Sequence, residues 1–167
     1  MKNDHSVREI VAYHEAGHAV ITWVLKQPLY RIYISDFEGK VAGGTVHLYA
    51  LDPDFMSDSD WRKVKNGALI LLAGESAERA YYELHELDCD EFLSSHDLRE
   101  LSDMLIKFGE HVCPPVAMSK KALKDESDSL VVKHWNQIEA LAKELMSKGE
   151  VQGPEAVLII ESTKLHE

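Results

Sequence analysis

Residues 14–18 read His-Glu-Ala-Gly-His and carry the clearest chemistry in this sequence. Residues four apart in a helix lie on the same face, so His14 and His18 would present two imidazoles to one metal ion. Neutral imidazole nitrogens are typical zinc ligands. Glu15, beside that face, can take a proton from a water molecule and pass it to a leaving amine. The spacing therefore predicts a zinc site with hydrolytic chemistry.

The sequence around this motif predicts a helix. Residues 6–9 have the pattern of a capping box, and the apolar stretch Ile10 to Leu25 continues past both histidines. On a 3.6-residue period His14 and His18 lie on an otherwise apolar, buried stripe. The alternative is a pair of core histidines satisfied by hydrogen bonds. The glutamate next to them favours the metal site.

Composition limits the class of protein. The chain has 167 residues, 45% of them apolar, which predicts one domain over residues 1–167. A formal net charge of -11 argues against nucleic acid or an anionic membrane as partner, because both are bound through Lys and Arg. Cys89 and Cys113 are too few for a disulfide framework. With no signal peptide and no apolar run of membrane-spanning length, we expect a soluble cytoplasmic protein.

The pattern along the chain predicts a mainly α-helical α+β domain with a small antiparallel sheet. Residues 30–34 and 45–49 alternate as two strands of a hairpin, and Asp36 to Gly44 has turn composition. Trp61 to Leu84 follows as a long helix. Gly17, inside the first helix, indicates either a second backbone passing close to it or a tolerated helix glycine.

The second half of the sequence is predicted to be helical. A helix that includes Leu98 ends at Gly109. Ala117 to Lys148 is mostly helical, with a break expected in the polar stretch Lys124 to Ser129 and a stop at Gly149. A last short helix is expected to start at Pro154.

Three separated segments, in order, resemble the peptidase domain of the FtsH family of AAA metalloproteases. They are His-Glu-Ala-Gly-His-Ala-Val at 14–20, Leu-Leu-Ala-Gly-Glu-Ser-Ala-Glu at 71–78 and Ser-His-Asp-Leu at 95–98. The resemblance continues through 108–109 and 115–117 to the closing helices, so it covers nearly the whole chain. It implies an FtsH-like peptidase fold with a zincin-type active-site helix, and Zn²⁺ as cofactor. It also implies Asp97 as the third metal ligand beside His14 and His18, with Glu15 catalytic.

Two acidic residues near the motifs have alternative roles. Asp97 is also the third helical position of a capping box, Ser-Ser-His-Asp at 94–97, where its charge would favour the helix dipole. Glu78 would either accept the free N–H of a ligating histidine or pair at the helix surface with Arg79 or Tyr82.

Two further residues near the predicted metal differ in the roles open to them. His96 stands where the resemblance leads us to expect asparagine or a small polar residue. It would compete for metal, bind a substrate carbonyl, or be an exposed loop residue. Cys89, among acidic neighbours that raise the pKa of its thiol, is interpreted as a loop residue.

Together these features predict a zinc-dependent endopeptidase acting on peptides or unfolded polypeptide. The sequence contains no Gly-x-x-x-x-Gly-Lys-Ser/Thr nucleotide-binding loop, so we expect an ATP-independent, stand-alone domain unless an unfoldase acts in trans. The resemblance leaves a homo-oligomer open. Residues 45–49 would offer a strand edge to an extended substrate or be an ordinary hairpin strand.

The rival function is a non-catalytic, zinc-containing module that binds peptides or regulates a partner. Glu15 argues against it, because a purely structural zinc site needs no general base. No residue for stabilising an oxyanion can be named from the sequence.

Overall fold

Most of the described chain is helical. The computed structural model describes residues 7–47, 61–88, 93, 95–109 and 119–164. Its elements, in chain order, are α1 (Val7–Val24), β1 (Leu29–Phe37), β2 (Lys40–His47), α2 (Trp61–Leu84), α3 (Ser95–Gly109), α4 (Lys120–Lys133), α5 (Trp135–Lys148), β3 (Glu150–Gln152) and α6 (Gly153–Lys164). The predicted α+β class with a small antiparallel sheet is confirmed.

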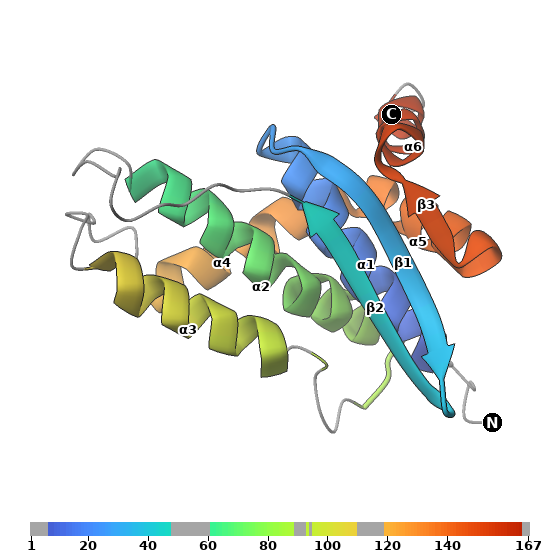
Figure 1. Cartoon of the computed structure of the whole chain (residues 1–167), viewed down its shortest axis with the longest axis horizontal. Helices are drawn as coiled ribbons and strands as arrows, with labels where there is room; N and C mark the ends of the chain where they lie inside the picture. The colour runs from blue at the N-terminus through green and yellow to red at the C-terminus, as the bar shows by residue number, and fades with distance from the viewer. Residues whose placement is uncertain (1–6, 48–60, 89–92, 94, 110–118, 165–167) are drawn as a thin grey trace.

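Helix α1 is surrounded on most of its circumference. Every residue from Val11 to Thr22 is buried, as expected of a central helix rather than an amphipathic surface helix. β1 and β2 cross one face of α1, while α2 and α5 pack against others (Figure 1). The histidine motif therefore lies in the interior, where a polar side chain needs a partner.

The sheet has the order β2-β1-β3, with antiparallel pairing throughout. Ile32 on β1 pairs with Thr45 on β2 and with Val151 on β3, so β2 is an edge strand within the described part of the chain. β3 is not predicted from the sequence, because three residues are too few for an alternation signal.

The prediction of a turn from Asp36 to Gly44 is wrong. β1 continues to Phe37 and β2 begins at Lys40, so only Glu38 and Gly39 form the turn. Both have positive φ, of 49° and 77°, as a tight two-residue hairpin turn requires. The glycines at 43 and 44 belong instead to the strand, where one of them makes room for a side chain of α1.

Close packing between α1 and α2 explains the glycine inside the motif. A Cβ on Gly17 would lie 2.6 Å from both the carbonyl oxygen of Ala73 and the Cβ of Ala77. Of the two alternatives left open for Gly17, the close approach of another backbone is the one that the structure shows. The bounds of α2 agree with the predicted Trp61 to Leu84.

The helix break expected between Lys124 and Ser129 is wrong. α4 runs through this polar stretch, and the interruption falls at His134 between α4 and α5. The stretch stays helical because its polar side chains bond to polar groups of α2. Lys124 bonds to Glu75, the Ser127 hydroxyl receives a hydrogen bond from Ser76, and Asp128 accepts two from Arg79.

The C-terminal elements agree closely with expectation. Gly149 ends α5 in the left-handed conformation, with φ of 78°. α6 starts at Gly153, one residue before the predicted Pro154. In the described ranges, no helix is both long enough and apolar enough to cross a lipid bilayer.

A second apolar cluster holds α3 against α2 and α4. Leu101 and Met104 of α3 pack there with apolar residues of the other two helices, namely Val64, Ala68, Leu69, Leu71, Leu72 and Leu123. This contact fixes the position of the first turn of α3, and with it Asp97.

Candidate metal centre

The side chains of His14, His18 and Asp97 lie together, with one potential metal-binding atom of each close to those of the other two. The Nε2 atoms of His14 and His18 lie 3.1 Å apart. Asp97 Oδ2 lies 3.0 Å from the first and 3.4 Å from the second, although Asp97 is 83 positions further along the chain than His14. Among the described residues this is a group that can hold a metal ion, with all three ligand atoms within 4.8 Å of one another.

The other ring nitrogen of each histidine has an acceptor. His18 Nδ1 lies 2.7 Å from the carbonyl oxygen of Ile70, to which its N–H donates. His14 Nδ1 lies 3.3 Å from Glu78 Oε2. A proton on each Nδ1 leaves each Nε2 free to bind a cation, which is the usual arrangement around a ligating histidine. Two imidazole nitrogens and a carboxylate are a donor set that suits zinc.

Helix α2 leaves room for the converging atoms because residue 74 is glycine. A Cβ there would lie 2.4 Å from His18 Nε2 and 2.5 Å from His14 Nε2. The backbone of α2 therefore forms one wall of the centre, and any larger residue at 74 would occupy part of it.

Glu78 contacts His14 of the candidate metal centre rather than a partner at the helix surface. Its side chain is fully buried, and both of its oxygens lie 3.1 Å from the backbone nitrogen of Leu93. Arg79, the surface partner considered from sequence, instead bonds to Glu75 and Asp128. Glu78 thus connects His14 to Leu93, which lies two residues before α3 in the chain.

The centre favours positive charge. Burial lowers the pKa of His14, but hydrogen bonds to Asp97 and Glu78 outweigh burial and raise that pKa to about 9. Burial raises the pKa of Asp97, yet the hydrogen bonds from His14 and His18 outweigh it and hold this pKa well below its usual range. Carboxylates that favour a proton on an imidazole also favour a cation between these groups.

The position of Asp97 is compatible with both of the roles considered from sequence. It lies in the first turn of α3, where a negative charge favours the helix dipole. Its side chain is only 18% exposed, and Oδ2 points to the histidines. The first residue of the predicted capping box, Ser94, lies outside the described residues, as does Cys89.

Glu15 is held against β2. Its side chain is buried, and its Oε2 accepts a hydrogen bond of 2.9 Å from the Thr45 hydroxyl. A Cβ on Gly43 would lie 2.8 Å from Glu15 Oε1. This pairing is not predictable from the sequence, because a threonine in a strand gives no sign of which helix it faces.

Two hollows of about 240 and 270 Å³ flank the centre. They share Glu15, Gly43, His96 and Asp97. The first is completed mainly by apolar side chains, those of Val11, Val41, Ala42 and Leu93, and by His14. The second is completed by more polar residues, namely His18, Gly44, Thr45, His47, Leu71 and Glu100.

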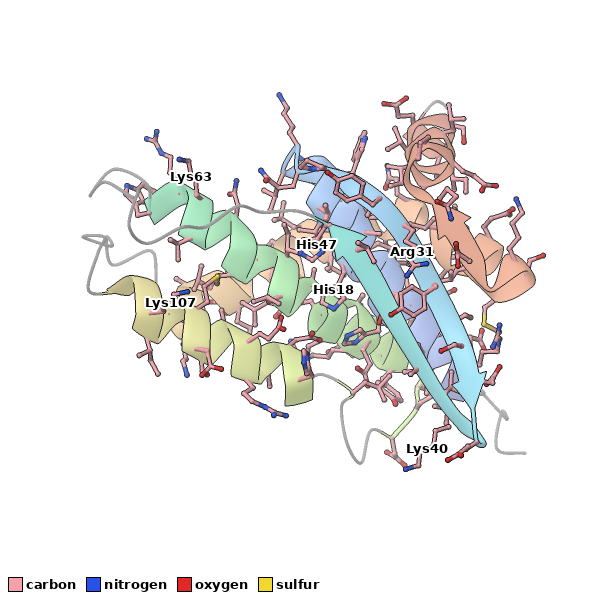
Figure 2. All side chains as sticks on the ribbon, viewed as in Figure 1. His18, Arg31, Lys40, His47, Lys63 and Lys107 are labelled. Atoms are coloured by element: carbon pink, nitrogen blue, oxygen red, sulfur yellow. The ribbon has the colours of Figure 1, made fainter. Side chains whose placement is uncertain are left out.

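Two histidines outside the motif, His47 and His96, line these hollows. His47 is the last residue of β2 and lies near His18 (Figure 2). Burial, and after it the nearby His18, lower the pKa of His47. Its Nδ1 is 3.2 Å from the carbonyl oxygen of Thr45. His96 is 71% exposed, as expected, but it lies in α3 and not in a loop.

No protein-family model matches the chain. A stretch of 77 residues is 35% identical to the ATP-dependent zinc metalloprotease FtsH of Thermotoga maritima. The match covers 45% of this chain and 12% of that relative, so the chain spans only a small part of the relative's length. This partial similarity relates the chain to a zinc metalloprotease.

Proposed function

We propose that this protein is a zinc-dependent endopeptidase that cleaves peptides or unstructured polypeptide. His14, His18 and Asp97 would hold the zinc, and Glu15 would act as general base and then general acid. One observation carries the proposal: two Nε2 atoms and a carboxylate oxygen converge within 4.8 Å beside the buried carboxylate of Glu15. The partial similarity to a zinc metalloprotease gives it independent support.

The chain's own residues would handle the proton. A bound zinc ion supplies Lewis acidity, which makes water more acidic and polarises the scissile carbonyl. Glu15 would take the proton from the attacking water and deliver it to the nitrogen of the leaving amine. Glu78 and the carbonyl of Ile70 would keep both histidines in the tautomer with a free Nε2.

The edge of β2 would bind the substrate as an added strand. Gly43, Gly44 and Thr45 on this strand line the hollows next to Glu15. An edge strand offers backbone hydrogen bonds only to an extended chain, so folded segments would be excluded. Substrate side chains on either side of the cleaved bond would enter the two hollows.

The test compares zinc-loaded wild type with Glu15→Gln on a pool of unstructured peptides, with cleavage followed by mass spectrometry. We expect Glu15→Gln to bind zinc and leave the peptides intact, and His14→Ala to lose both zinc and cleavage. Glu161→Gln, an exposed change on α6, is the control and should cleave like wild type.

Two results would contradict the proposal. A Glu15→Gln variant as active as wild type would exclude this mechanism. A zinc-loaded wild type that binds peptides without cutting them would indicate the non-catalytic module instead.

A further inference from the structure

One face of β2 lies against the catalytic centre. Successive residues of a strand point to opposite sides, so Gly43, Thr45 and His47 share one side. Gly43 and Thr45 both meet Glu15, and His47 lines a hollow together with Glu15. This strand therefore provides the immediate surroundings of the glutamate.

The carboxylate of a glutamate needs external contacts to have one orientation. Its terminal torsion is broad and roughly two-fold, so the chain itself does not select which oxygen points where. Here the two oxygens have different neighbours. Oε2 accepts from the Thr45 hydroxyl at 2.9 Å, and Oε1 lies in the space that the missing Cβ of Gly43 leaves open.

The Thr45 hydroxyl has two acceptors and one proton. Besides Oε2, it lies 3.0 Å from the backbone carbonyl oxygen of Glu15. A charged carboxylate is the stronger acceptor, so the hydroxyl donates to Oε2 while Glu15 is ionised. The bond joins β2 to α1 at the residue that has to move a proton.

We propose that Thr45 is the positioning residue for Glu15: its hydroxyl holds Oε2, so that Oε1 is the oxygen that exchanges the proton with water and leaving group. This inference rests on the proposed function. Thr45 does not touch the reacting atoms and acts through the orientation of Glu15. Because Thr45 belongs to the strand whose edge would bind substrate, the same element would align the peptide and the base.

The experiment compares Thr45→Val, which keeps the shape but removes the hydroxyl, with Thr45→Ser, which keeps the hydroxyl. We expect Thr45→Val to lower kcat by about 10- to 100-fold, because small misplacements of a catalytic group have effects of this size. KM and zinc affinity should stay within about threefold, and Thr45→Ser should recover most of kcat. Thr163→Val is the matched control, since it removes a threonine hydroxyl bonded to a backbone carbonyl on α6.

A second measurement needs no activity. In zinc-free protein, Thr45→Val should lower the urea midpoint of unfolding more in the wild-type background than in Glu15→Ala, because only the former has the carboxylate partner. If the wild type cleaves nothing, the proposed function fails. The comparison of Thr45→Val in the two backgrounds, a double-mutant cycle, still decides whether Thr45 holds Glu15. Equal shifts in both backgrounds, wild-type kcat in Thr45→Val, or a Thr45→Ser as slow as Thr45→Val would each overturn the inference.

Discussion

Among single residues, Glu78 is a fully buried carboxylate that contacts two separate parts of the candidate site. It is buried with no exposed surface, faces Nδ1 of His14, and accepts from the backbone nitrogen of Leu93. Leu93 in turn lines one of the hollows beside the centre. A single carboxylate therefore holds both His14 and Leu93, a residue that lines one of the hollows.

Glu78→Gln is predicted to weaken zinc binding by about 10- to 100-fold, the usual effect of removing the partner of a ligating histidine. The amide keeps the shape but carries no charge, so its oxygen accepts weaker hydrogen bonds from His14 and Leu93 than the carboxylate does. Competition against a chelator measures the affinity. Glu83→Gln, an exposed change on the same helix, should leave it unaltered. Equal affinities in both variants would show that Glu78 has no part in the centre.

The protonation of His14 predicts how the stability of the zinc-free protein depends on pH. Folding raises the pKa of His14 to about 9. A group whose pKa is raised stabilises the fold fully below its unfolded pKa of about 6.5 and loses this contribution as pH rises through the folded value. The free energy of unfolding should therefore fall between about pH 6.5 and 9, by at most about 3 kcal/mol.

Urea unfolding in the presence of EDTA at several pH values measures this loss. The comparison is with His14→Gln, which has no titrating ring and should show a shallower decline over the same range. Parallel curves for the two proteins would mean that His14 carries no stabilising proton in the folded state.

At the scale of elements, the contact between α1 and α2 depends on two glycines, Gly17 and Gly74, which leave room for different groups. A Cβ on Gly74 would meet the ends of two imidazoles, whereas a Cβ on Gly17 would meet the backbone of Ala73. Imidazole rings can turn away, but the backbone of a packed helix cannot. The two alanine variants should therefore fail in different ways.

Gly74→Ala is predicted to abolish tight zinc binding while the zinc-free protein stays folded. The Cβ displaces both Nε2 atoms, and alanine gains about 1 kcal/mol of helix propensity over glycine. Gly17→Ala should instead lower the stability of the zinc-free protein by about 1–3 kcal/mol through overpacking. Calorimetry and zinc titration of both variants measure these effects. A Gly74→Ala that binds zinc like wild type would contradict the geometry of the centre.

The sequence predicts those features of the elements that depend on nearby residues, and not those that depend on contacts with a distant element. Local patterns predicted α2, the pair of histidines on α1 and the stop at Gly149, because periodicity and glycine conformation act within a few residues. The break in α4 was misplaced, because the partners of Lys124 and Asp128 lie on another helix. Thr45 was missed for the same reason: its meeting with Glu15 depends on how β2 crosses α1.

At the scale of the whole molecule, the centre joins parts of the chain that are far apart in sequence. His14 and His18 are on α1, and Asp97 is on α3, which is held to α2 and α4 by the cluster around Leu101 and Met104. A cation bound by all three residues would add a direct link between α1 and α3. Zinc should therefore stabilise the fold in addition to its proposed role in peptide hydrolysis.

Zinc at about 1,000 times its Kd is predicted to stabilise the wild-type protein by about 4 kcal/mol, since it binds the folded state. Because Asp97 carries the link, amide exchange should slow most in Ser95–Gly109 and least in α5, which contributes no ligand. Asp97→Asn should lose the zinc-dependent part of both effects.

If Asp97 served only the helix dipole, its replacement by asparagine would change stability by about 1 kcal/mol or less and leave zinc affinity as in wild type. Exchange measured with and without zinc in both proteins separates the two roles, because a helix cap stabilises α3 in either condition and a ligand stabilises it only with the metal.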